Sequence, residues 1–263
     1  MVSDREISAA LEAARAAGQA ILPFYQQALD VFEKGDGSPL TVADQAAHRA
    51  ICERLAPTGV PVVSEEGGDL RMELDRYWLV DPLDGTKDFL VANGEFTVNV
   101  ALVEGDRTIF GVVSSPASDR LWFGGEGHPA AGYVAGRLVA AAHDPVAPVL
   151  RVAVSRFHDH PDVDVFINAN VPAMRVPMGS ALKYCQLASA DVDVFPRLVG
   201  CSEWDTAAGQ AIVEAAGGRV LDWHTGLPLR YGKRGRRNPR LLSFRAPYVR
   251  ESFRSMEYAQ ELL

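Results

Sequence analysis

Long apolar segments are absent from this sequence. It contains no run of about 18 apolar residues, the length that a membrane-spanning helix requires. Its first residues form an Ala-rich amphipathic pattern, without the charged, apolar and small-residue sections that make up a signal peptide. We therefore expect a cytoplasmic protein without a transmembrane segment.

Cysteine is scarce, and the few cysteines are not arranged for disulfides or zinc. Cys52, Cys185 and Cys201 are far apart and odd in number, and no Cys-x-x-Cys spacing occurs. Basic residues are outnumbered as well, with 26 Lys and Arg against 34 Asp and Glu, for a formal net charge of −8. Because a polymer of phosphates requires a basic protein face, the composition argues against nucleic acid as the partner.

What remains is the composition of a globular protein with a sizeable core. The chain has 263 residues, of which 48% are hydrophobic, enough for one large domain or for two halves that share an interface. Residues 1–140 predict helices at about 3–27 and 41–55 and a mostly antiparallel sheet, whereas residues 141–263 predict alternating strands and helices. We expect an α/β fold class with these two halves.

One stretch, residues 77–89, combines a strand with two closely spaced acids. Four aromatic and branched residues predict a buried strand, and the proline that follows Asp81 is expected to end its ladder there. Asp84 comes next, so a turn would present two carboxylates, the Leu83 carbonyl and several backbone N–H groups together. Oxygens suit Mg²⁺, and N–H groups at a helix start suit a phosphate. The alternative is an ordinary strand followed by an Asp-Gly turn.

Acidic residues also follow a second predicted strand. Residues 60–63 are expected to form a short strand that ends at Ser64-Glu65-Glu66, and functional groups collect just beyond the carboxyl ends of strands in α/β sheets. Solvated side chains are the alternative for this pair of glutamates. Two further acids have ordinary structural explanations, since Asp44 lies in the first turn of a predicted helix and Asp205 at or near the N-cap of another.

The C-terminal region turns basic. Six Lys and Arg residues lie between positions 233 and 245, and an amphipathic helix is expected from about Tyr248. A solvated basic loop is the simplest interpretation of this cluster. Binding of an acidic partner or of substrate phosphates is the alternative.

Together these motifs resemble the inositol monophosphatase superfamily of Mg²⁺-dependent, lithium-sensitive phosphomonoesterases. The resemblance is carried by Asp-Pro-Leu-Asp-Gly-Thr at 81–86, by Trp-Asp-Thr-Ala-Ala-Gly at 204–209, and by the glutamates upstream. Within the superfamily, residues 84–89, 93–99 and 179–183 look like the bacterial 3'(2'),5'-bisphosphate nucleotidases. The resemblance spans nearly the whole chain and implies a layered α/β/α/β/α phosphatase fold.

The resemblance implies a set of metal ligands. One Mg²⁺ would be held by Glu65, Asp81 and the Leu83 carbonyl, and a second by Asp81, Asp84 and Asp205, with a third, weaker ion at Glu65. Paired metal ions clamp an in-line phosphoryl transfer, and acids crowded near a phosphate would otherwise repel it. The metal is therefore expected to be obligatory.

The resemblance also implies that water, and no protein side chain, is the nucleophile. Asp44 would accept a hydrogen bond from the Thr86 hydroxyl, which would orient the attacking water and help to deprotonate it. With Glu65 these two residues form the predicted catalytic group. The N–H groups of Gly85 and Thr86 would bind the phosphate oxygens at a helix start.

A bisphosphate nucleotide carries a second phosphate, and Lys183 and Arg197 lie where the resemblance would place its cationic partners. Ordinary surface charge is the alternative for both. The implied activity is hydrolysis of the 3'-phosphate of adenosine 3',5'-bisphosphate to AMP and phosphate, and of its sulfated relative, by a monomer or a homodimer. The predicted substrate-binding residues are Leu83, Asp84, Gly85, Thr86, Gly179, Ser180, Lys183, Arg197 and Asp205.

Two other functions stay open. Inositol and sugar monophosphatases share the metal motifs, so metal chemistry does not separate these substrates, although residues 94–99 and 179–183 favour the nucleotide. A metal-dependent phosphate-ligand sensor would retain binding without turnover. The presence of both Asp44 and Thr86 argues against a sensor, since a sensor has no need of a pair that activates water.

Overall fold

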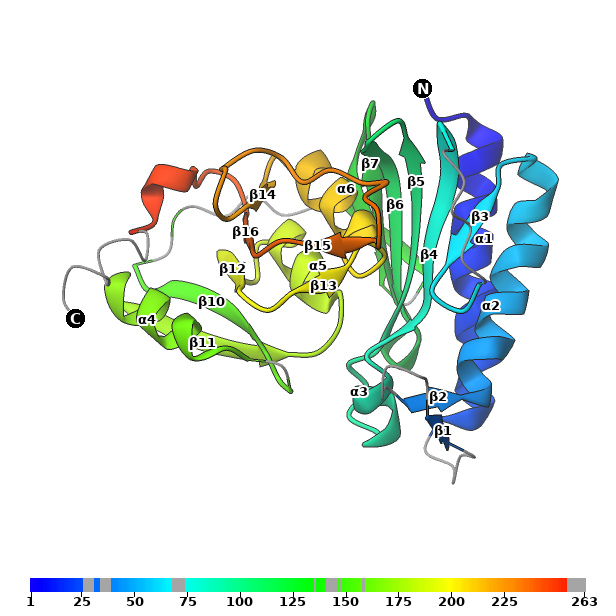
Figure 1. Cartoon of the computed structure of the whole chain (residues 1–263), viewed down its shortest axis with the longest axis horizontal. Helices are drawn as coiled ribbons and strands as arrows, with labels where there is room; N and C mark the ends of the chain where they lie inside the picture. The colour runs from blue at the N-terminus through cyan, green and yellow to red at the C-terminus, as the bar shows by residue number, and fades with distance from the viewer. Residues whose placement is uncertain are drawn as a thin grey trace.

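Helices and sheets alternate as α/β/α/β/α layers across the molecule (Figure 1). Two helices cover one face of a seven-stranded sheet, two more lie between that sheet and a five-stranded sheet, and a fifth covers the far face of the smaller sheet. The predicted fold class is thereby confirmed. The computed structural model describes residues 1–25, 31–33, 39–67, 74–134, 136–140, 146, 148–157 and 159–254.

The outer helices are α1 (Asp4–Ile21) and α2 (Val42–Leu55), the inner ones α5 (Leu182–Ala188) and α6 (Ala207–Ala215), and the far one α4 (Pro161–Ala169). Within the described residues, none of the helices is long and apolar enough to span a membrane. Helix α1 begins at the predicted capping box, where Glu6 N donates to Ser3 Oγ and Ser3 N donates to the Glu6 carboxylate.

The seven-stranded sheet has its strands in chain order, from β3 to β9. Strands β3 and β4 are parallel, and every later neighbour is antiparallel, as expected for strands joined by short turns. The strands are β3 (Val62–Ser64), β4 (Arg76–Asp84), β5 (Thr97–Glu104), β6 (Arg107–Ser115), β7 (Arg120–Gly125), β8 (His128–Val134) and β9 (Arg137–Ala140).

The five-stranded sheet has the order β11-β10-β12-β16-β14. Strand β10 is parallel to both of its neighbours, whereas β16 is antiparallel to β12 and β14. Its strands are β10 (Leu150–Ser155), β11 (Ala173–Met178), β12 (Val194–Arg197), β14 (Arg219–Asp222) and β16 (Leu241–Phe244). Two small pairs join β1 (Val31–Glu33) to β2 (Pro39–Thr41) and β13 (Cys201–Ser202) to β15 (Arg237–Asn238).

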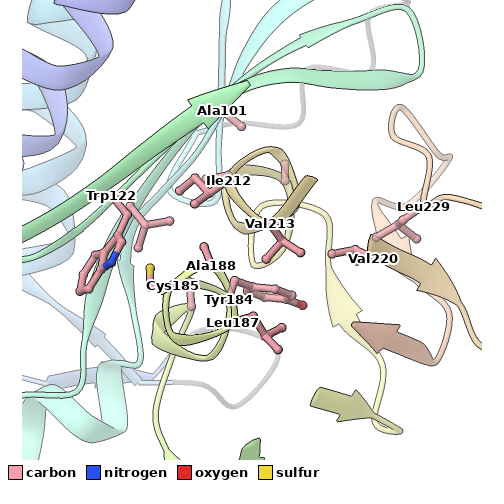
Figure 2. Packing of buried hydrophobic residues seen from close by; sticks show 14 of the residues in the cluster. Ala101, Trp122, Tyr184, Cys185, Leu187, Ala188, Ile212, Val213, Val220 and Leu229 are labelled. Atoms are coloured by element: carbon pink, nitrogen blue, oxygen red, sulfur yellow. The ribbon is translucent and has the colours of Figure 1, made fainter. Parts of the chain in front are cut away.

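Both faces of the seven-stranded sheet are buried, because alternate residues of each strand point to opposite layers. Along β4, Trp78 and Val80 pack with α1 and α2, whereas Tyr77 and Leu79 belong to the core that faces α5 and α6. Figure 2 shows this second core, in which side chains of the two inner helices gather beside Trp122 of β7. The two halves of the chain therefore share one core.

The division into residues 1–140 and 141–263 stays a proposal. The larger sheet ends with β9 and the smaller one begins with β10, so the proposed boundary falls between the two sheets. Part of the expected connecting segment, residues 141–145 and 147, lies outside the described residues.

Strand β4 does not end at Asp81, contrary to our expectation. Its ladder with β5 is interrupted by a bulge and resumes at Asp84, which pairs with Thr97. Proline is tolerated here because a bulge leaves residues unpaired, so the missing N–H of Pro82 breaks no ladder bond.

Two predicted helix ends also differ. The first helix stops at Ile21 and continues as a 3-10 turn, Leu22–Phe24, in which proline at position 23 can donate no helical hydrogen bond. At the other end of the chain, the expected helix from about Tyr248 is reduced, within the described residues, to a 3-10 turn at Arg250–Ser252. The last part of that prediction, residues 255–263, lies outside them.

The basic C-terminal region is only partly a solvated loop, since Arg234 and Arg237 are exposed whereas other cations contact buried acids. Glu203 is fully buried, and its carboxylate accepts from the backbone N–H groups of Gly232 and Lys233 at 3.1 and 2.9 Å and from Lys233 Nζ at 2.8 Å, with Arg236 Nη1 at 3.5 Å. Arg245 is likewise buried against Asp193. These cations neutralise buried acids of the same half, which is the condition for burying a carboxylate at low cost.

A glycine in the shared core supports a test of the packing. A Cβ on Gly111 would lie 2.3 Å from the Ala208 carbonyl oxygen and 2.8 Å from its Cα, both backbone atoms of α6. We expect Gly111→Ala to destabilise the protein by about 1–3 kcal/mol, because the helix must move away from the sheet. Denaturant unfolding measures this loss. The matched control is Gly200→Ala, whose Cβ would find its nearest neighbours at 3.8 Å; equal midpoints for the two variants would contradict the packing described.

Candidate active site

Parallel pairing of β3 and β4 brings the first two acids together. Ser64 is opposite Val80, and the Glu65 N–H donates to the Val80 carbonyl at 3.2 Å. Glu65 follows the last residue of β3, and Asp81 follows Val80 within β4, so the two lie next to each other at the carboxyl end of β3. The backbone thus places these two acids side by side, and their joint role in a metal site stays a prediction.

The bulge in β4 places Asp84 near Asp81, at the carboxyl end of the strand. Asp81 is opposite Asn99 and Asp84 is opposite Thr97, with Leu83 in the bulge between them. The Leu83 N–H donates to Asp81 Oδ1 at 3.1 Å, and Asp84 Oδ2 accepts from Asn99 Nδ2 at 3.3 Å and from Thr97 Oγ1 at 3.5 Å. Both carboxylates are thus oriented by hydrogen bonds from β4 and β5.

The second half of the chain contributes Asp205. It lies between β13 and α6, near the N-cap as predicted, and the N-cap position itself is occupied by Thr206. Asp205 Oδ2 accepts instead from the Ser202 N–H at 3.0 Å and from Arg197 Nη2 at 3.4 Å. The side chain is therefore free of a capping role and is held at the boundary between the halves.

The acids form one electrostatic group around Asp81. Burial raises the pKa of Asp81 well above its ordinary value, and the neighbouring charges of Glu65, Asp84, Asp205 and Asp44 raise it further. Burial and Asp84 likewise raise the pKa of Asp205 to about 6, against the opposing effect of Arg197. Burial and like charge both disfavour the ionised form, and a bound cation would relieve both.

This oxygen-rich set suits a hard divalent cation in its chemistry. Among the described residues, however, no group of three His, Cys, Asp or Glu side chains has the spacing of a complete metal centre. The assignment of Glu65, Asp81, Leu83, Asp84 and Asp205 as metal ligands therefore stays a prediction.

Gly85 starts the helix that was expected to bind phosphate. It has φ 87°, a left-handed conformation that favours glycine, and it precedes α3 (Thr86–Leu90). The Thr86 hydroxyl donates to the Leu83 carbonyl at 3.4 Å. Asp44 is buried in the first turn of α2, and its hydrogen bond to Thr86 stays a prediction.

The two halves meet at Gly85 and Gly179. A Cβ on Gly85 would lie 3.2 Å from Ser180 Cβ and 3.3 Å from Asp88 Oδ2, and a Cβ on Gly179 would lie 2.6 Å from Asp88 Oδ2. These approaches leave no room for larger residues. The structure thus brings the predicted phosphate-binding and substrate-binding segments into contact.

Ser180 has two features that are typical of a binding residue. Its backbone is left-handed, with φ 45°, and its buried Oγ has no hydrogen-bond partner among the described residues. Strained backbone and unpaired buried hydroxyls are uncommon and concentrate at functional sites. Ser180 does not open the following helix as expected, since α5 begins at Leu182 without a side-chain cap.

Lys183 and Arg197 are not ordinary surface charges. Lys183 is 1% exposed, and its Nζ donates to the Met178 carbonyl at 3.1 Å and lies 5.3 Å from the centre of the Phe195 ring. Burial and the nearby charge of Arg197 lower the pKa of Lys183 to about 8, while Asp84, Asp88 and Glu95 act in the opposite direction. Lys183 is therefore influenced by these acids without a direct ion pair to them among the described residues, whereas Arg197 contacts Asp205 at 3.4 Å.

Several site residues had no role assigned from the sequence. Thr97 and Asn99 are polar residues two apart in an otherwise apolar strand, a signal that they share one face of β5. Asp88 and Glu95 fall inside the stretches that carried the resemblance, yet their contacts with Gly179 involve the other half of the chain. Such contacts have no local sequence signal.

Comparison with known proteins identifies the family. A family model described as the inositol monophosphatase family matches residues 3–251. The chain belongs to the inositol monophosphatase family. The resemblance inferred from the motifs at 81–86 and 204–209 is therefore confirmed.

Relatives and solved structures agree with this assignment. The 3'(2'),5'-bisphosphate nucleotidase CysQ of Escherichia coli strain K12 is 40% identical over 228 residues, which make up 84% of this inositol monophosphatase-family chain and 92% of that protein. The crystal structure of CysQ from Bacteroides thetaiotaomicron is 36% identical, with a TM-score of 0.81 and coverage of 92% of this chain and 97% of that chain. The Thermotoga maritima IMPase, 23% identical, has a TM-score of 0.78 over 97% of this chain and 98% of that one, and shows the fold alone.

The raised pKa values predict how stability depends on pH when divalent cations are removed. A folded-state pKa above the unfolded one means that the contribution is fully present below about pH 4 and is lost as pH rises through the folded pKa. In excess chelator we expect the free energy of unfolding to fall as the pH rises from about 4 through about 6, the pKa of Asp205, and beyond it as Asp81 ionises, and we expect Asp81→Asn to reduce that fall. Urea unfolding at several pH values measures it.

The matched control is Glu53→Gln, which removes a carboxylate from the exposed face of α2. We expect its pH dependence to match that of the unmodified protein. If the free energy of unfolding fell as steeply with pH in Asp81→Asn as in the unmodified protein, burial and the neighbouring carboxylates would not raise the pKa of Asp81 as described.

Proposed function

We propose that this protein is a Mg²⁺-dependent phosphomonoesterase that hydrolyses the 3'-phosphate of adenosine 3',5'-bisphosphate, giving AMP and phosphate. The observation that carries the proposal is the convergence of buried acids from both halves beside the contact of Gly85 with Ser180. Its substrate is supported by relatives, 40% identical, that are named 3'(2'),5'-bisphosphate nucleotidase. The sulfated relative of the nucleotide is proposed as a further substrate.

Glu65, Asp81, the Leu83 carbonyl, Asp84 and Asp205 are the groups that would hold two Mg²⁺ ions, with a third, weaker ion at Glu65. When bound, these ions supply positive charge that polarises the phosphate and lowers the pKa of water. The choice of Mg²⁺ follows from the donor set, which consists of hard oxygens without thiolate or imidazole.

The protein's own residues would position the phosphate and the water. The N–H groups of Gly85 and Thr86 lie at the start of α3, where backbone donors and the helix dipole would favour an anion. The Thr86 hydroxyl would orient the attacking water, with Asp44 as its acceptor. Arg197 would keep Asp205 in place through the contact at 3.4 Å.

The structure bears on which cations are proposed to bind the second phosphate of the substrate. Arg197 Nη2 contacts Asp205 at 3.4 Å, whereas its buried Nε has no hydrogen-bond partner among the described residues, so Arg197 stays a proposed substrate-binding residue. Lys183 lies just beyond the Gly179–Ser180 segment and is the cation that we propose for the second phosphate. The buried, unpaired hydroxyl of Ser180 would supply a hydrogen bond to the same part of the substrate.

The substrate is tested by phosphate release in the presence of Mg²⁺, with adenosine 3',5'-bisphosphate compared to inositol 1-phosphate. We expect the nucleotide to be preferred by more than about tenfold in kcat/KM, because only it fills both phosphate positions. Excess chelator is expected to abolish release from both. A preference for inositol 1-phosphate would be consistent with phosphomonoesterase activity but would contradict the proposed nucleotide substrate.

A sensor is distinguished from an enzyme by Thr86→Ala. We expect kcat to fall by about 100-fold, because the hydroxyl that orients water is lost, while the affinity for the nucleotide changes little. Thr86→Ser keeps the hydroxyl and should retain most of the activity, and Thr225→Ala, in an exposed turn, should retain all of it. A protein that binds the nucleotide but releases no phosphate even without substitution would be a sensor.

A further inference from the structure

A network of charged and backbone groups joins the two halves beside the site. Arg156, directly after β10, donates to both carboxylate oxygens of Glu95, with Nε–Oε2 at 2.7 Å and Nη2–Oε1 at 2.6 Å. The same guanidinium donates to the Pro177 carbonyl at 3.2 Å, and Glu95 Oε2 also accepts from the Gly179 N–H at 2.7 Å. Glu95 of the first half is therefore bound to β10 and to the end of β11 in the second half at once.

On its own side, Glu95 is fixed to α3, the helix that follows the phosphate-binding turn. The Glu95 N–H donates to Asn93 Oδ1 at 2.9 Å, and Asn93 Nδ2 donates to Asp88 Oδ1 at 2.6 Å. Asp88 and the Glu95 carbonyl are also the atoms that a Cβ on Gly179 would meet, at 2.6 and 2.7 Å. The network thus connects the phosphate-binding turn to the Gly179–Ser180 segment through a continuous chain of contacts.

The geometry of the Glu95–Arg156 pair exceeds what an ordinary surface ion pair offers. The guanidinium engages the carboxylate as a fork, which fixes both distance and orientation. The side chains are 23% and 36% exposed, so solvent screens their attraction only in part. The pair also holds Glu95 where it accepts a hydrogen bond from the N–H of Gly179, the residue that follows β11.

We propose that the Glu95–Arg156 pair is a positioning element that holds the Gly179–Ser180 segment against Gly85 before the substrate binds. The inference rests on the proposed function, which assigns that segment to the substrate. Ser180 has the strained φ of 45°, and such a conformation persists only when the surroundings impose it. Without the pair, the segment would have to be ordered during binding, which weakens affinity without altering the acidic group.

The test is a double-mutant cycle with Glu95→Gln and Arg156→Gln, assayed with adenosine 3',5'-bisphosphate in excess Mg²⁺. We expect each single substitution to raise KM by about tenfold with kcat changed less than about twofold, and the double variant to be no worse than either. Arg156→Lys keeps the charge but not the fork, so an intermediate KM is expected.

The matched control is an ion pair that also joins the two halves, Asp106 and Arg230, with 3.0 Å between Oδ1 and Nη1. Asp106→Asn is expected to leave KM and kcat unchanged, since neither residue contacts the site. An unchanged KM in Glu95→Gln and Arg156→Gln would overturn the proposal. So would a tenfold rise in the control, because any ion pair between the halves would then have the same effect.

Hydrogen exchange at the Gly179 amide tests the positioning without substrate. We expect faster exchange in Glu95→Gln and Arg156→Gln and no change in Asp106→Asn, because the Gly179 N–H donates to Glu95. Unchanged exchange overturns the positioning role. If exchange responds as expected but the unmodified protein does not hydrolyse the nucleotide, the proposed substrate fails and the positioning role of the pair stands.

Discussion

The concentration of carboxylates around Asp81 is the constraint on which the rest of the structure depends. A buried carboxylate beside Glu65, Asp84, Asp205 and Asp44 is unfavourable in its ionised form, as its raised pKa shows. Part of this cost is offset locally by the Leu83 N–H on Asp81 and by Arg197 on Asp205. The remainder must come from the packed layers, and a bound cation would offset it further, so the site depends on the fold as well as on its own contacts.

The layered fold meets this demand because the site lies where its two halves join. Glu65, Asp81 and Asp84 lie at the carboxyl ends of β3 and β4, whereas Asp205 belongs to the second half of the chain. Separating the two halves would therefore remove Asp205 from the other acids. Close backbone approach at Gly111 and Gly179 keeps the halves in contact. The shared core of α5 and α6 against the sheet fixes their relative position (Figure 2).

Much of the fold and part of the site could be predicted from local patterns. The capping box at Ser3 and Glu6 and the acid that follows β3 are read within a few residues, and the structure has them as expected. Predictions that depended on distant partners were wrong or only partly right: β4 continues past Pro82 because β5 pairs with Asp84, and part of the basic C-terminal region folds onto Glu203. No pattern within either segment encodes these partners.

The sequence by itself determined which chemical groups the protein brings to its site, and the alternation that buries both faces of the large sheet. It also specified the family, through motifs whose residues stand in the right order. Only the tertiary structure decided that Arg197 turns to Asp205, that Lys183 is buried, and that Glu95 reaches Gly179. The physical reason is that electrostatic energies and close packing depend on distance and burial between residues remote in the chain, which the order of neighbouring residues does not express.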